Sequence, residues 1–289
     1  MEQHHLSKRT RTTRSRALRW ASRSSLLVAV IAAVVSAPAQ AATTTSDGRA
    51  PSPAPAPRAA DIDFPTPTGE RAVDSTIEVS GTFDGELTRY YGTGDLGGSG
   101  QDEGQPAMFA LEDGATLRNV VIGAPAADGV HCLGSCTISN VWWEDVGEDA
   151  ATSDASSSEA VMTISGGAAR QAEDKVFQHN GPGTVRVEDF AVSDFGKLYR
   201  SCGNCSESNQ RNVVLNNVSV YAPGKALVGI NTNYGDTARL SGITVHGDSE
   251  REITICGKYR GVTEGEPEQI GSGPDDTHCL YTAEDITYG

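Results

Sequence analysis

Residues 117–122 read LRNVVI, and this six-residue pattern recurs along the chain. An apolar residue comes first, two polar or small residues follow, and the fourth and sixth positions are apolar again. The pattern returns at four later places, beginning at Ile138, Val187, Leu215 and Leu240. Successive starts lie 21, 49, 28 and 25 residues apart, and VMTISGG, around Ile164, divides the longest interval into two ordinary ones. A unit of 21 to 28 residues therefore recurs six times.

The composition and period of these units predict the fold class. They are short, rich in Val, Ile and Thr, and bounded by Gly, Asp and Asn, which is typical of strands and turns. A period of this length indicates a solenoid. We therefore expect an all-β, single-domain, right-handed parallel β-helix. The third position of the unit should lie in a left-handed bend whose side chains hydrogen-bond from turn to turn, as at Asn119, Asn140, Asp189 and Asn217. A β-sandwich with irregular strands is the alternative.

The first 41 residues predict a secretory signal peptide. Seven Lys and Arg residues precede the apolar run LLVAVIAAVVSA, and residues 39–41 form a small-x-small cleavage signal. The apolar run is short for a bilayer span, and a retained membrane anchor is the alternative. Residues 42–63 are rich in Pro and Ala and predict a linker, whereas residues 64–289 predict the β-helix domain.

Charge limits the partners of the exported chain. Without residues 1–41, the 23 Lys and Arg become 16 and the 38 Asp and Glu become 37. The resulting net charge of about −21 argues against nucleic acid and against a membrane surface as partners. We expect a soluble, secreted, extracellular monomer.

Six cysteines remain in the predicted domain, and an even number in an exported chain indicates disulfides. The simplest of fifteen possible pairings joins sequence neighbours, namely Cys132 with Cys136, Cys202 with Cys205, and Cys256 with Cys279. CGNC at 202–205 also has the spacing of redox and zinc sites, which is the alternative for that pair.

Three acidic residues form the first candidate site. Asp128 precedes Glu148 and Asp149 by 20 and 21 residues, which is about one turn of the predicted coil. The three carboxylates should therefore converge at one edge, where hard oxygen ligands suit Ca²⁺. Zinc is less expected although His131 is near, because the cysteines are expected in disulfides. A solvated acidic face is the alternative.

Three basic residues form the second candidate site. Lys197 and Arg200 follow Lys175 by 22 and 25 residues, again about one turn. A lysine beside an arginine and a bound metal should have a lowered pKa and could act as a base. The alternative is a set of salt bridges to the acidic residues Glu173, Asp174 and Asp194.

One histidine and two neighbouring tryptophans are also candidates for a role in a site. His179 is interpreted as a turn residue without a chemical role. Trp142 and Trp143 should face opposite sides of a strand, one toward the core and the other available to a sugar ring.

Four longer stretches resemble motifs of the family-three pectate lyases: ADGVHCLGSCTISNVWWEDVGEDAAT, DKVFQHNGPGTV, DFGKLYRSCGNC and LVGINTNYGDTA. The resemblance extends from about Phe64 to the end of the chain. It includes GQDEGQPAMFALEDGATLRNVVIG and the last two cysteines. It implies a secreted microbial enzyme with a compact right-handed β-helix.

The resemblance also implies roles for individual residues. Asp128, Glu148 and Asp149 match the calcium ligands of the family. Lys175, Lys197 and Arg200 match its basic cleft residues and are the expected catalytic residues, with Lys175 as the general base and Arg200 as its main rival. Lys197, Arg200 and Glu103 are expected to bind substrate. Glu103 matches an acid near the cleft, for which a solvated loop carboxylate is the alternative. The chain departs from the family at SGGAAR and in the loop SDASSSE, neither of which is expected to touch these residues.

The implied reaction is calcium-dependent β-elimination of polygalacturonate to unsaturated oligogalacturonides. An amine base that is neutral only at raised pH predicts an alkaline optimum. A polygalacturonase-like hydrolase, in which Glu148 and Asp149 act as paired carboxylates, is one alternative. A non-catalytic polysaccharide-binding β-helix is the other. The three basic residues favour the lyase over both.

Overall fold

The computed structural model describes residues 62–98, 100–102 and 104–289. The predicted signal peptide, nearly all of the predicted linker and Glu103 lie outside the described residues. Within them the regular secondary structure is almost entirely β-strand, and the helices are the short 3-10 turns η1 (Gly94–Leu96), η2 (Thr232–Tyr234) and η3 (Ala283–Asp285). None of the described helices has the length or the hydrophobicity to cross a bilayer.

The strands are short near the start of the described chain and long in its middle. Their bounds are β1 (Glu70–Val73), β2 (Ile77–Val79), β3 (Thr82–Gly92), β4 (Phe109–Leu111), β5 (Ala115–Ile122), β6 (Val130–Cys132), β7 (Cys136–Trp143), β8 (Ala151–Ser153), β9 (Val161–His179), β10 (Gly183–Ser201), β11 (Arg211–Asn231), β12 (Thr237–His246), β13 (Thr254–Arg260), β14 (Glu268–Ser272), β15 (Cys279–Leu280) and β16 (Ile286–Tyr288).

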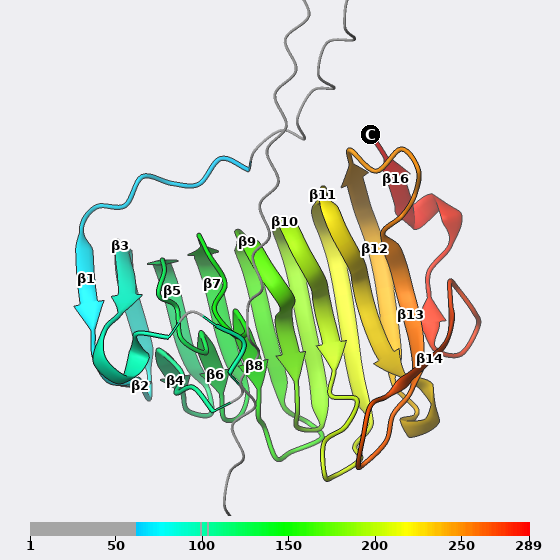
Figure 1. The fold of residues 1–289 in the computed structure, drawn as a ribbon, viewed down its shortest axis with the longest axis horizontal. Coiled ribbons are helices and arrows are strands. Elements are labelled where there is room, and N and C mark those ends of the chain that lie inside the picture. The colour runs from blue at the N-terminus through cyan, green and yellow to red at the C-terminus, as the bar shows by residue number, and fades with distance from the viewer. Residues whose placement is uncertain (1–61, 99, 103) are drawn as a thin grey trace, which may run out of the picture. The chain divides into compact units, whose positions relative to one another are not determined.

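Successive turns of the chain pair through parallel strands, which lie side by side in chain order (Figure 1). One row runs through β1, β3, β5, β7, β9, β10, β11 and β12. A second row runs through β2, β4, β6 and β8 and continues along the later parts of β9, β10 and β11 to β13. Of the described pairings, β13 with β14 is antiparallel. Parallel stacking confirms the β-helix and rules out the antiparallel sandwich.

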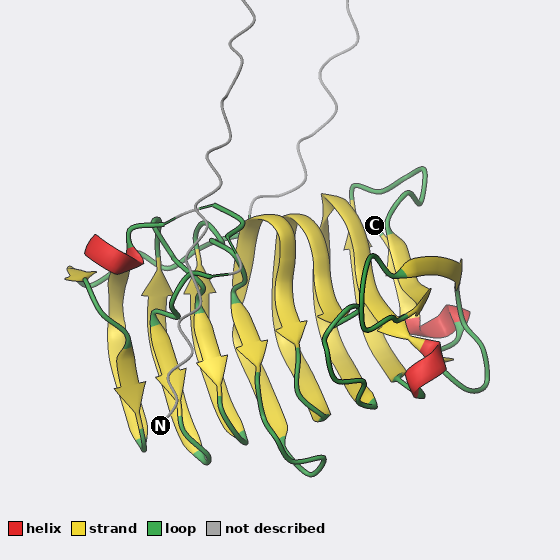
Figure 2. Cartoon of the chain, turned by 60° about the horizontal axis from the view of Figure 1, so that its bottom comes forward, coloured by secondary structure: helices red, strands yellow, loops and turns green. Residues whose placement is uncertain are grey.

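The first positions of the repeated unit form one continuous column across the first row. Each is paired in register with the next, and all are buried: Leu117, Ile138, Ile164, Val187, Leu215 and Leu240. The interval between repeats is therefore one turn of the coil, as the sequence predicted. Figure 2 shows these stacked turns from another side, with loops along the edges of the strands.

The third position of the unit makes the predicted left-handed bend. Asn119, Asn140 and Asn217 have φ values of 52°, 53° and 53°. Asn140 Nδ2 donates to Asn119 Oδ1 at 2.8 Å, and Asn217 Nδ2 donates to Asp189 Oδ1 at 2.6 Å. Gly166 occupies the same position between these pairs with φ 72°. Because glycine has no side chain, the predicted ladder is interrupted there and forms two separate parts.

The second row carries its own buried column, which sets the direction of the neighbouring side chains. Its members are paired in register from turn to turn: Phe109, Val130, Ala151, Phe177, Tyr199, Val228 and Cys256. Side chains alternate along a strand, so the residue after each member points away from this column. His131, Gln178 and Arg200 occupy such positions.

All three predicted disulfides are present: Cys132–Cys136, Cys202–Cys205 and Cys256–Cys279. The CGNC segment therefore offers no thiolate to zinc and no free thiol pair for redox exchange.

His179 is a buried polar residue of the coil interior, and it predicts a pH effect on stability. Its Nδ1 lies 2.9 Å from the Tyr199 hydroxyl, and burial, with Arg211, lowers the pKa of His179 to about 3. In the unfolded chain His179 binds a proton below about pH 6.5, whereas in the folded chain it stays neutral until about pH 3. The free energy of unfolding therefore falls as pH falls from about 6.5 toward 3. From pH 7 to pH 5, the free energy of unfolding should fall by about 2 kcal/mol more in the wild type than in His179→Gln. Urea unfolding at both pH values measures this difference, and equal pH dependence in the two proteins would contradict the assignment.

Candidate active site

The three predicted acidic residues come together. Asp128 and Asp149 each precede a strand of the second row by two residues, and those strands pair Val130 with Ala151. One carboxylate oxygen from each of Asp128, Glu148 and Asp149 lies within 4.8 Å of the others. All three side chains are buried, so the solvated acidic face is wrong.

The chemistry of this acidic cluster fits a hard divalent cation. Asp128 Oδ1 and Asp149 Oδ1 are buried and have no hydrogen-bond partner among the described residues. Burial raises the pKa of Asp149 well above its ordinary value; Lys175 opposes this shift and Glu148 adds to it. Buried carboxylate oxygens with unused lone pairs are the ligands that Ca²⁺ takes in proteins.

His131 orients one of these acids. Its Nε2 lies 2.9 Å from Asp128 Oδ2 and its Nδ1 lies 3.0 Å from Asp154 Oδ2. Burial lowers the pKa of His131, but the two carboxylates outweigh burial and raise it to about 10. With both ring nitrogens engaged, His131 holds Asp128 in place and offers no ligand to zinc. Asp154 belongs to SDASSSE, so this loop contacts His131 and is linked through it to Asp128.

Lys175 connects the acidic cluster to the basic residues. Its Nζ lies 3.1 Å from Glu148 Oε1, 3.2 Å from Asp174 Oδ2 and 3.8 Å from Asp149 Oδ1. Burial lowers the pKa of Lys175, but the carboxylates of Asp149, Glu148 and Asp174 outweigh burial, and the net shift is upward. The expected lowering of this pKa is therefore not produced by the protein groups themselves.

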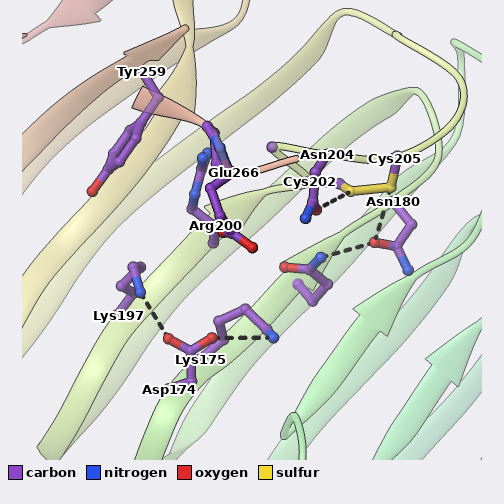
Figure 3. Close-up of a pocket in the computed structure, with 13 residues that line it drawn as sticks. Asp174, Lys175, Asn180, Lys197, Arg200, Cys202, Asn204, Cys205, Tyr259 and Glu266 are labelled. Carbon is purple, nitrogen blue, oxygen red and sulfur yellow. Dashed lines mark hydrogen bonds and ion pairs between the residues drawn. A yellow bond between two sulfur atoms is a disulfide. The ribbon is translucent and has the colours of Figure 1, made fainter. Parts of the chain in front are cut away.

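Lys197 lies one turn further along the coil, paired in register with Lys175. Its Nζ is 2.7 Å from Asp174 Oδ1, so Asp174 lies between the two lysines (Figure 3). The salt-bridge alternative is thus correct for Asp174. Glu173 and Asp194 line a different pocket together with Asp145.

Arg200 is buried on β10, three residues after Lys197. Its Nη1 donates to the Ser201 carbonyl at 2.7 Å and to Asn231 Oδ1 at 3.0 Å, and its guanidinium lies 4.2 Å from the centre of the Tyr259 ring. Its Nη2 is buried without a hydrogen-bond partner among the described residues. Burial lowers the pKa of Arg200, although a guanidinium remains charged in proteins.

The basic residues line one cleft of about 670 Å³, together with side chains that the sequence did not single out. Tyr259 and Glu266 come from β13 and from the connection after it, and both lie beside Arg200 in Figure 3. Trp143 is buried in the core, as expected of one tryptophan. Trp142 packs against Phe64 with ring centres 5.4 Å apart, and it does not line this cleft.

Known proteins are similar in sequence to most of this chain. The family model described as pectate lyase matches residues 61–266. The chain belongs to the pectate lyase family. Pectate lyase H of Emericella nidulans is 48% identical over 226 residues, which cover 76% of this chain and 84% of that protein. Probable pectate lyase E of Neosartorya fischeri is 51% identical over 224 residues, covering 75% and 84%.

Solved structures of the family share the fold. The catalytic domain of pectate lyase PelI from Erwinia chrysanthemi is 32% identical, with a TM-score of 0.63, covering 74% of this chain and all of that one. PelI in complex with tetragalacturonic acid is 33% identical, with a TM-score of 0.65, covering 75% of this chain and 70% of that one.

Proposed function

We propose that this chain is a secreted, calcium-dependent pectate lyase that cleaves polygalacturonate by β-elimination to unsaturated oligogalacturonides. The observation that carries the proposal is Lys175, whose Nζ contacts Glu148 of the acidic cluster and also lines the cleft that contains Lys197 and Arg200. A candidate base, a candidate cation site and two cationic side chains therefore adjoin one another.

The basic side chains suit a substrate with one carboxylate on each sugar. Arg200 holds its guanidinium on protein acceptors through Nη1, and the guanidinium lines the cleft, where its positive charge can attract a substrate carboxylate. Lys197 would contribute a second positive charge at the neighbouring turn. PelI, a relative with the same fold, binds tetragalacturonic acid.

Lys175 is the better candidate for the base. A lysine becomes a neutral amine at alkaline pH, whereas a guanidinium does not deprotonate in proteins. Neutral Lys175 Nζ would accept the proton from C5 of the sugar. The electron pair of the C5–H bond becomes the C4=C5 double bond, and the glycosidic O4 leaves with the C4–O pair and takes a proton from water.

The acidic cluster would hold Ca²⁺ through Asp128, Glu148 and Asp149. The ion would supply positive charge that offsets the substrate carboxylate and acidifies the C5 proton. His131 and Asp154 would keep Asp128 oriented toward the cluster.

Three disulfides fit an extracellular protein, and the signal peptide expected at residues 1–41 would direct its export. The strongly acidic chain fits a protein that remains soluble outside the cell.

The test is the product formed from polygalacturonate by the purified protein at alkaline pH. Unsaturated uronides should accumulate, measured by their ultraviolet absorbance, with calcium present, and a chelator should stop their formation. A glycosidase reaction would shorten the polymer without unsaturated product. A polymer that stayed intact at every pH and calcium concentration would contradict both reactions and favour a non-catalytic polysaccharide-binding protein.

A further inference from the structure

LVGINTNYGDTA at 227–238 has no role in the reaction proposed above, although Gly229 and Asn231 within it accept hydrogen bonds from Arg200, which lines the cleft. Strand β11 ends within it at Asn231, and η2 follows. Asp236 closes this turn by accepting the backbone N–H groups of Asn231 and Arg211, both at 2.9 Å. The turn is therefore fixed by buried hydrogen bonds next to Arg200.

The side chain of Asn231 makes hydrogen bonds to Arg200 and Cys202, and both of these residues line the cleft. Its Oδ1 accepts from Arg200 Nη1 at 3.0 Å, and its Nδ2 donates to the Cys202 carbonyl at 2.8 Å. The side chain is fully buried, so water does not compete for these bonds. One amide thus ties the guanidinium to the wall of the cleft that carries the Cys202–Cys205 disulfide.

The neighbouring Asn233 fixes the chain just after β13, the strand that carries Tyr259. Its Nδ2 donates to the Gly261 carbonyl at 2.9 Å and its Oδ1 accepts from the Gly261 N–H at 2.7 Å. The Val262 N–H donates to the Gly203 carbonyl at 2.8 Å and joins this part of the chain to the segment that carries the Cys202–Cys205 disulfide. Asn231 and Asn233 therefore hold the two neighbouring segments that contain Cys202 and Gly261.

The hydrogen-bond acceptors of Arg200 are neutral, whereas the two lysines contact carboxylates. Lys175 and Lys197 contact carboxylates, whereas the acceptors of Arg200 within the described part of the chain are the Ser201 and Gly229 carbonyls and the amide of Asn231. A neutral acceptor orients the guanidinium without pairing its charge. A carboxylate in the same place would form a buried ion pair and compete with the substrate.

We propose that Asn231 is a positioning residue that fixes Arg200 through a neutral acceptor, so that the guanidinium keeps a positive charge in the cleft that is not neutralised by a hydrogen-bonded carboxylate and can attract a substrate carboxylate. The proposal rests on the proposed function for the identity of the substrate. Tyr259, stacked on the guanidinium at 4.2 Å, limits its movement in the remaining direction.

The test is Asn231→Asp, which keeps the shape of the side chain and replaces the amide by a carboxylate. Binding of tetragalacturonate is measured by calorimetry in a Lys175→Ala background, with calcium present, and kcat/KM is measured with Lys175 intact. We expect the dissociation constant to rise at least tenfold and kcat/KM to fall by a similar factor. Asn216→Asp is the matched control, because Asn216 is an exposed residue of the same strand that contacts Ser241.

A double-mutant cycle separates positioning from a general effect on the fold. In an Arg200→Ala background, Asn231→Asp should change the dissociation constant less than twofold. An undiminished effect in that background, or wild-type affinity in a folded Asn231→Asp protein, would overturn the proposal. If Asn231→Asp does not fold, Asn231→Ala carries the same cycle. A wild-type protein that binds the oligomer without unsaturated product would refute the lyase reaction and leave the Asn231 cycle interpretable.

Discussion

Lys175→Ala is expected to lower kcat on polygalacturonate by about 10²- to 10⁴-fold, the range that general bases contribute. The physical reason is that Lys175 Nζ is the amine that adjoins both the cleft and the acidic cluster, at 3.1 Å from Glu148 Oε1. The initial rate at which the ultraviolet absorbance rises, at saturating substrate, measures kcat. The dissociation constant of an oligogalacturonate should change much less than kcat.

Two variants one turn away provide the comparison. Lys197→Ala removes an equivalent amine that contacts Asp174 at 2.7 Å, and it should act mainly on KM. Arg200→Ala should also act mainly on KM, because Arg200 is assigned to substrate binding. If Arg200→Ala abolished kcat while Lys175→Ala retained it, the assignment of Lys175 as the base would be wrong. Partial recovery of the Lys175→Ala protein by an added small amine would support the assignment further.

The pH dependence of the wild type follows from the same residue. The carboxylates of Asp149, Glu148 and Asp174 raise the pKa of Lys175 against the effect of burial, so the amine is protonated at neutral pH. An amine must be neutral to accept a proton, and kcat/KM should therefore increase with pH into the alkaline range. Positive charge added at the acidic cluster opposes protonation of Lys175, so higher calcium concentrations should move the rising limb to lower pH.

The fold and the candidate site were predictable from one property of the sequence, the repeat interval. Because that interval is a turn of the coil, Leu117 lies under Ile138, and the same arithmetic places Asp128 beside Asp149 and Lys175 beside Lys197. Spacing alone therefore identified neighbours along the coil axis.

Contacts that depend on side-chain packing were not predictable in this way. Asn231 lies 31 residues from Arg200, and its amide meets the guanidinium because the turn before Asp236 is fixed by buried hydrogen bonds. Tyr259 reaches the same guanidinium from β13. The direction of the Lys175 pKa shift also escaped prediction, because it results from burial and three carboxylates acting in opposite senses.

Asp149→Asn is expected to weaken calcium binding by about 100-fold or more, because it removes one charged ligand from a set of three. The change should not destabilise the protein without calcium, because Asp149 is buried beside Glu148 and burial already disfavours its charged form. Calorimetric titration of the full chain with CaCl₂ measures the affinity. Thermal unfolding with and without calcium provides a second readout, since a ligand at 100 times its dissociation constant stabilises the folded state by about 2.7 kcal/mol.

Asp145→Asn is the matched control for this variant. Asp145 lies four residues before Asp149 and outside the acidic cluster, so its substitution should leave the calcium affinity within about twofold of the wild type, as expected for a residue that contributes no ligand. Equal affinities in Asp149→Asn and Asp145→Asn would place the ion elsewhere. A reduced calcium affinity in Asp149→Asn alone, together with loss of the calcium-induced rise in unfolding temperature, would locate the ion at the three carboxylates independently of any measurement of catalysis.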